Sequence, residues 1–171
     1  MATLVLTALG DDRPGLVEAL SRLISEHGGS WSRSEMARLG GKFAGIVEAV
    51  VPDDRVDALR GGLDALAAGG VLHTTLDVAG AAVAPAGRRV TVALVGTDQP
   101  GLVLAVSAAL AAVGASIEEL ATRVSEAPMA GGQMFEADAV VVLPAGVAED
   151  DVRDQLEALA THLMVDIVLD A

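Results

Sequence analysis

The chain has 171 residues, of which 52% are hydrophobic and 2% aromatic, and its net charge at pH 7 is −13. This acidic balance argues against direct nucleic-acid binding, because the recognition of phosphates needs a basic surface. An apolar run of about 18 residues, a basic signal-peptide start and cysteine are all lacking, which predicts a cytoplasmic protein with no membrane span, disulfide or thiolate metal site.

The first half of the chain predicts the order β-α-β-β-α-β. Short apolar and β-branched segments favour strands at 3–8, 30–39, 43–51 and 71–78. Apolar residues at helical spacing predict a helix from Leu16 to His27, and Gly28 then supplies a left-handed cap. Pro52, followed by two acids, predicts a second helix that runs to about residue 68.

The second half repeats this order. We expect strands at 90–95, 117–124, 135–143 and 163–169, and helices at 102–113 and 149–161. The Ala/Gly/Pro-rich segment 80–88 predicts a linker between domains at 1–79 and 89–171. Six extra residues in the second half are expected in the hairpin at 125–133.

The predicted fold class is α+β, with two ferredoxin-like βαββαβ domains in tandem. Each domain should have an antiparallel sheet with both helices on one face. The strands are apolar on both sides: Val90, Val92 and Leu94 alternate with Thr91, Ala93 and Val95. We therefore expect the open face of each sheet to be covered by another repeat, and the chain to form a homodimer.

A long motif occurs twice, 86 residues apart. Gly10-Asp11-Asp12-Arg13-Pro14-Gly15-Leu16 returns as Gly96-Thr97-Asp98-Gln99-Pro100-Gly101-Leu102, and Gly28-x-Ser30 returns as Gly114-x-Ser116. Each turn precedes a helix whose unpaired N–H groups suit a carboxylate, while Asp11 or Asp12 could hold an ammonium group. Arg13 could add a carboxylate contact, and its replacement by Gln99 predicts unequal sites. Ser30 and Ser116 begin the strand that we expect beside the same turn.

Two simpler interpretations remain open at this point. Asp12 and Asp98 could be ordinary helix N-caps, each followed by a proline at the first helical position. Trp31, the only tryptophan, could belong to the packed core or line the first site.

Both halves resemble ACT domains, the small regulatory modules of amino-acid metabolism. The resemblance rests on the Gly-x-Asp-[Arg/Gln]-Pro-Gly-Leu turn and the polar residue that opens the second strand, where serine stands in place of the family's frequent asparagine. It covers the whole chain, as in the glycine cleavage system transcriptional repressor group. The ligand-binding residues that it implies are Gly10, Asp11, Asp12, Arg13, Pro14, Gly15, Leu16, Ser30, Trp31, Gly96, Thr97, Asp98, Gln99, Pro100, Gly101, Leu102, Ser116 and Ile117.

The resemblance implies a non-enzymatic regulator that senses a small amino acid, with glycine as the candidate. Because the chain is acidic, we expect it to control transcription through a protein partner and not by binding DNA itself. We expect no cofactor, no metal and no catalytic residue. Two alternatives are a regulatory subunit of an amino-acid biosynthetic enzyme and a ligand-free dimerisation module.

Overall fold

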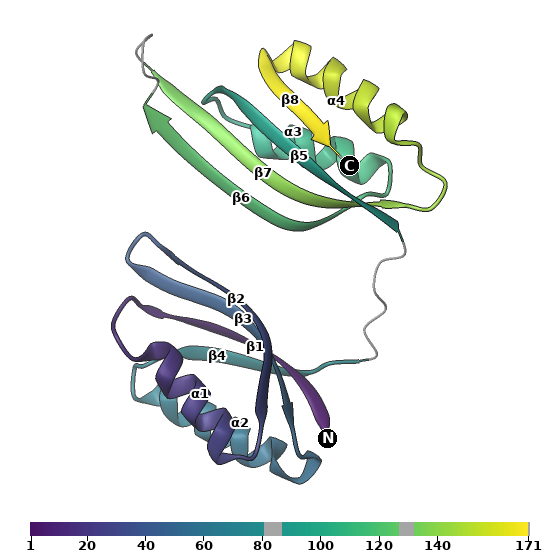
Figure 1. Cartoon of the computed structure of the whole chain (residues 1–171). Helices are drawn as coiled ribbons and strands as arrows, with labels where there is room; N and C mark the ends of the chain where they lie inside the picture. The colour runs from purple at the N-terminus through teal and green to yellow at the C-terminus, as the bar shows by residue number, and fades with distance from the viewer. Residues whose placement is uncertain (81–86, 127–131, 171) are drawn as a thin grey trace. The chain divides into compact units, whose positions relative to one another are not determined.

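The computed structural model describes residues 1–80, 87–126 and 132–170. The chain divides into two compact units, Met1–Ala82 and Val83–Ala171 (Figure 1). Most of the expected linker (81–86) and of the expected hairpin insertion (127–131) lies outside the described residues. Within the described ranges, every helix is too short or too polar to cross a membrane.

The first unit has the predicted β-α-β-β-α-β order. Its elements are β1 (Ala2–Asp11), α1 (Leu16–Glu26), β2 (Ser30–Leu39), β3 (Lys42–Val51), a 3₁₀ turn η1 (Asp53–Arg55), α2 (Val56–Ala68) and β4 (His73–Val78). The strands form an antiparallel sheet in the order β2-β3-β1-β4, and both helices lie on one face of it (Figure 1). The ferredoxin-like prediction is confirmed for this unit.

The core of the first unit lies between the sheet and the helices. Alternate residues of β1 point into it, so that Leu4 and Leu6 are fully buried. On α1 the buried side chains are Leu16, Leu20 and Ile24, which recur every four residues along one face. The sequence pattern thus fixes which face of each element is covered.

The ends of the helices follow from local backbone chemistry. Gly28 has a φ of 69° and donates its N–H to Ser25 O at 2.9 Å, so the predicted left-handed stop of α1 is confirmed. The second helix begins at Val56, later than predicted, because Asp53–Arg55 form a 3₁₀ turn first. Such a tight turn is common where a helix starts.

The second unit repeats the architecture. Its elements are β5 (Gly87–Thr97), α3 (Leu102–Ala112), β6 (Ser116–Glu126), β7 (Gln133–Pro144), α4 (Glu149–Leu163) and β8 (Val165–Asp170). Its antiparallel sheet has the order β6-β7-β5-β8, again with both helices on one face (Figure 1). On β5, Val90, Val92 and Leu94 are buried, whereas Thr91 and Val95 are exposed within the unit. Coverage of this open face stays a prediction.

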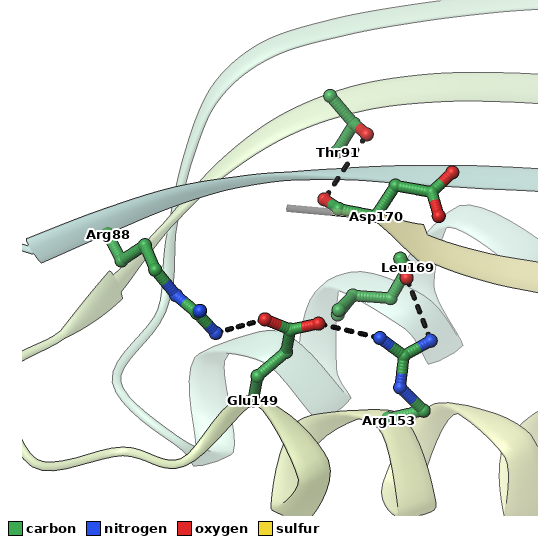
Figure 2. A network of polar contacts seen from close by, with 6 residues as sticks. All are labelled: Arg88, Thr91, Glu149, Arg153, Leu169 and Asp170. Atoms are coloured by element: carbon green, nitrogen blue, oxygen red, sulfur yellow. Dashed lines mark hydrogen bonds and ion pairs between the residues drawn. The ribbon is translucent and has the colours of Figure 1, made fainter.

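A network of hydrogen bonds and ion pairs connects the start of α4 to β5 and β8 (Figure 2). The Glu149 carboxylate accepts hydrogen bonds from Arg88 and, at 2.6 Å, from Arg153. Arg153 also donates to Leu169 O at 2.8 Å, and Arg60 of the first unit donates to Leu76 O in the same way at 3.3 Å. Glu149 is therefore the shared acceptor that links α4 to β5.

Replacing Glu149 by alanine is expected to lower the free energy of unfolding by about 1–2 kcal/mol, because two guanidinium groups lose their common acceptor. Urea unfolding followed by circular dichroism measures this change. Asp154, exposed on the same helix, provides the control: Asp154→Ala should change the free energy by less than about 0.5 kcal/mol. Equal effects of the two variants would contradict the role given to Glu149.

Candidate functional site

The two duplicated turns join the first strand of each unit to its first helix. The helices begin at Leu16 and Leu102, and their N-caps are Gly15 (φ 91°) and Gly101 (φ 95°), with no side-chain capping hydrogen bond at either. The interpretation of Asp12 and Asp98 as N-caps is therefore wrong. Glycine takes the cap because this backbone conformation is strained for other residues. Among the described residues, no side chain caps the first N–H groups of either helix.

The prolines of the motif also lie outside the helices. Pro14 and Pro100 precede the glycine caps and are not the first helical residues, which corrects the sequence-based placement. Their fixed φ instead stiffens the turn immediately before the cap. Leu16 and Leu102, the first helical residues, are 3% and 2% exposed, so their side chains belong to the cores and only their backbones face the turns.

Backbone hydrogen bonds hold each turn against the hairpin between the second and third strands of its unit. Asp12 N donates to Gly41 O at 2.9 Å, and Asp98 N donates to Gln133 O at 2.8 Å. Gly41 lies in the tight turn between β2 and β3, and Gln133 is the first residue of β7. The hairpin is therefore the neighbour of the motif in both units.

The fourth position of the motif, which is Arg13 in the first unit and Gln99 in the second, has the same structural role in both units. Arg13 Nη2 donates to Gly70 O at 3.0 Å, and Gln99 Nε2 donates to Leu163 O at 2.7 Å. Both carbonyls lie at the end of the second helix of the unit, where backbone acceptors lack partners within the helix. In this structure Arg13 and Gln99 thus tie the turn to α2 and α4.

The acids of the first turn are paired with bases from the hairpin. Lys42 donates to Asp11, and Arg38 Nη1 lies 3.2 Å from Asp12 Oδ2. The Lys42 ammonium lowers the pKa of Asp11 below its ordinary value of 3.8, by its hydrogen bond first and by its charge second. With Arg13 included, three bases surround two acids at this turn.

The second turn has a different electrostatic environment. The positions of Asp11, Arg38 and Lys42 are taken by Thr97, Val124 and Met134. Asp98 is exposed, and no ion pair involves it in the described part of the chain. An open hollow of about 630 Å³ lies alongside, lined by Gly96, Thr97, Met134, Glu157, Ala160, Thr161, Met164, Val165, Asp166 and Ile167.

The serines that open the second strands lie far from the turns of their own units. Ser30 pairs with Val50, which is level with Thr3, whereas the turn follows Asp11 at the other end of β1. Seven residues of strand separate Thr3 from Gly10, or about 23 Å. Ser116 pairs with Val142 and is displaced from its own turn in the same way. The expectation that each serine lies beside the turn of its own unit is wrong.

Trp31 and Ile117 directly follow these serines, so they also lie at the end of the sheet that is distant from the turn of their own unit. Both side chains are partly buried, Trp31 against the core of the first unit and Ile117 against that of the second. The structure therefore brings together the turn residues of each unit and separates them from the two residues that open its second strand.

The comparisons with known proteins agree with this architecture. The family model of the ACT domain matches residues 2–75. The chain is 30% identical to an unknown protein from Galdieria sulphuraria whose crystal structure has a TM-score of 0.87, with 99% of this chain and 97% of that chain covered. The chain belongs to the ACT domain family. It is also similar in fold to a candidate glycine cleavage system transcriptional repressor (20% identity, TM-score 0.71, 99% and 96% covered). No protein with a curated description matches the sequence.

The residues that sequence reasoning missed belong to the hairpin of each ACT domain. Arg38, Lys42 and Gly41 contact the first turn, and Gln133 contacts the second. The signal was present in the predicted strand order: in a ferredoxin-like sheet the third strand lies beside the first, so an antiparallel hairpin must end next to the turn.

The Asp11–Lys42 pair makes a prediction about acid stability. Because the folded pKa of Asp11 is lowered, the pair contributes stability above the unfolded pKa and loses it as pH falls through the folded pKa. Lys42→Met, which copies the second ACT domain, should return the pKa of Asp11 toward its ordinary value. A carboxyl-carbon NMR titration measures this shift. Lys42→Arg should keep the pKa low, and an unchanged pKa in Lys42→Met would contradict the pairing.

Proposed function

We propose that this protein is a cytoplasmic, non-enzymatic regulator that senses a small amino acid, with glycine as the candidate ligand. It acts as a homodimer on a protein partner in the transcriptional control of amino-acid metabolism. The observation that carries the proposal is the pair of helix N-termini with no side-chain cap, each beside an aspartate of the turn. Membership of the ACT domain family supports it.

A free amino acid carries one carboxylate and one ammonium group, and the duplicated turn offers a partner for each. Unpaired N–H groups at a helix start favour a carboxylate through hydrogen bonds and the helix dipole. An aspartate carboxylate favours an ammonium group. These two contacts fix the orientation of a zwitterion without any contact to its side chain, which suits glycine.

The second turn is the better candidate for ammonium binding. Asp98 faces no basic side chain among the described residues, whereas Asp12 is engaged by Arg38. Thr97, next to Asp98, lines the open hollow, whose volume of about 630 Å³ is ample for a small amino acid. We therefore propose that the two turns bind the ligand unequally, with the Gly96–Gly101 turn as the tighter site.

The serines join this site only through a second copy of the chain. Ser116 lies at the far end of its own sheet from the Gly96–Gly101 turn. Ser116 begins β6, which is an edge strand of its sheet. If the β6 strands of two copies paired antiparallel, Ser116 of one copy would lie at the end of the sheet where the Gly96–Gly101 turn of the other copy lies. The proposed homodimer therefore supplies the hydroxyl group that a single unit cannot supply.

A thermal-shift screen of the purified chain against the twenty amino acids tests the proposal. A ligand at one hundred times its dissociation constant adds about 2.7 kcal/mol to stability, which is readily measured in domains of this size. We expect a selective shift with a small amino acid, glycine first. Identical melting temperatures across the whole panel would contradict the proposal.

A further inference from the structure

The buried core of the second ACT domain is interrupted beneath α3. Among the described residues, the buried side chains of the first domain form one continuous cluster. Those of the second domain form two, one that includes Leu110 and Ala139 and another that includes Leu102 and Phe135. A cavity of about 30 Å³ is lined by residues of both clusters, and it has room for about two water molecules.

The cavity is a narrow slot that follows α3. On the helix side its lining runs from Leu102 to Leu110, which is about 12 Å along the helix axis. On the sheet side its lining on β7 runs from Phe135 to Ala139, which is about 13 Å along the strand. Because the helix wall and the sheet wall have nearly the same length, the slot is much longer than it is wide.

The walls of the slot offer no free hydrogen-bonding group to an occupant. All the side chains that line it are apolar except that of Ser107. The Ser107 hydroxyl donates to Leu104 O at 3.1 Å, so it is already engaged within the helix. A water molecule is retained in a cavity only where it finds two to four polar partners. The slot therefore favours an apolar occupant over water.

The slot opens to solvent between α3 and β6. Its exposed lining residues are Val103 on α3 and Leu120 on β6, which are 43% and 49% exposed. Side chains that are exposed to this degree change rotamer readily, so they can swing outward and widen the slot. The helix α3 carries no charged residue. The entrance is therefore apolar and uncharged, and it can admit an apolar group from solution.

The first ACT domain packs the equivalent region differently. Larger side chains stand at three of its positions: Trp31 for Ile117, Val47 for Ala139 and Leu20 for Val106. The opposite holds at two positions: Leu94 for Ala8 and Leu120 for Ser34. These leucines fill part of the space in the second domain, but the cavity remains. Ala139 and Val106 are therefore positions where the slot can be filled with residues that the fold already accepts.

We propose that the second ACT domain binds an unbranched alkyl chain in this slot, parallel to α3. A long, narrow and apolar space suits a flexible chain better than a ring or a branched group. Residues 88–171 hold 13 acids and 4 bases, a balance that opposes contact with an anionic membrane surface, so we assign the chain to a free alkyl compound. The slot shares no lining residue with the hollow beside Thr97, so this site is additional to amino-acid sensing.

A titration of the methyl-labelled chain with 1-butanol, 1-hexanol and 1-octanol, followed in ¹³C–¹H correlation spectra, tests the site. These probes are uncharged, so the acidity of the domain does not oppose their binding. We expect saturable shifts of the methyl groups of Leu102, Val106 and Leu120, and none at Leu16 and Leu20 of the first domain. The dissociation constant should fall about fourfold for each added methylene group.

Two variants fill the slot by copying the first domain. Ala139→Val and Val106→Leu should each weaken the binding of 1-octanol at least about tenfold, and a loss of folding in one would leave the other as the test. Ala121→Val is the matched control: Ala121 is exposed and adjacent to Leu120, so its side chain lies on the opposite face of the sheet. It should leave the affinity for 1-octanol unchanged. Urea unfolding followed by circular dichroism verifies that each variant is folded.

Three results would overturn the site: equal shifts in both domains, an affinity that does not depend on chain length, or unchanged binding of 1-octanol in both filled variants. Sedimentation with phosphatidylcholine vesicles separates the two sources of an alkyl chain. We expect the protein to stay in the supernatant. Co-sedimentation that is lost in Ala139→Val would instead assign the slot to the acyl chain of a membrane lipid and overturn the free compound as its ligand.

Discussion

Replacing Gly96 by alanine should lower the free energy of unfolding of the second ACT domain by about 2–3 kcal/mol, the upper range for overpacking a core. A Cβ atom at this position would lie 2.3 Å from Val165 Cγ1 and 2.7 Å from Val165 Cβ. Val165 packs with Leu94, Leu102 and Phe135 in a buried cluster, so the clash cannot be relieved by rotating one free side chain. Urea unfolding followed by circular dichroism measures the loss.

Gly61 provides a control with the opposite sign. A Cβ atom there would meet nothing within 4 Å, and the residue lies inside α2. Gly61→Ala should therefore stabilise the first domain by about 0.5–1 kcal/mol through the higher helix propensity of alanine. If Gly96→Ala were neutral, the glycine at this point of the motif would have a role other than close packing.

Asp98→Ala should weaken the binding of the amino acid at least about tenfold, which corresponds to about 1.4 kcal/mol. Asp98 has no basic partner among the described residues and lies next to the hollow-lining Thr97. Asp12→Ala should change the affinity less than about threefold, because Arg38 already engages that carboxylate. Isothermal titration calorimetry with the amino acid found in the screen measures both affinities.

The matched control for this pair is Asp150→Ala. It removes the same charge from an exposed position in the first turn of α4 and should leave the affinity unchanged. If Asp12→Ala abolished binding while Asp98→Ala did not, the first turn would be the principal site. The assignment of unequal sites would then be reversed.

The fold could be predicted from the sequence because the duplicated motif and the hydrophobic periodicity of each half indicated the same order of helices and strands. Two copies of one motif, each followed by helical and then alternating apolar patterns, permit few topologies, and β-α-β-β-α-β is the one observed. The buried faces also followed from pattern, as Leu16, Leu20 and Ile24 show. Such agreement between local signals and the global fold is typical of a foldable sequence.

The site could be predicted only in part, because it depends on backbone conformation and strand register. The sequence showed that Asp12 precedes a helix but not that the glycine after Pro14 takes the cap in a left-handed conformation. From the sequence we expect Ser30 beside the turn, because only one helix separates the two. In the structure that helix carries the chain back to the other end of the sheet, so Ser30 lies far from the turn. The strand register also places Arg38 beside Asp12 and Lys42 beside Asp11, so these two bases compensate the charges of the two acids.

The most direct test of amino-acid sensing is a ¹⁵N–¹H correlation spectrum of the chain titrated with glycine, and then with the other small amino acids. We expect saturable shifts of the backbone amides from Thr97 to Val103, with smaller shifts at the Gly10–Gly15 turn. Shifts confined to other parts of the chain, or none with any amino acid at millimolar concentration, would contradict the proposal that these turns form the binding site.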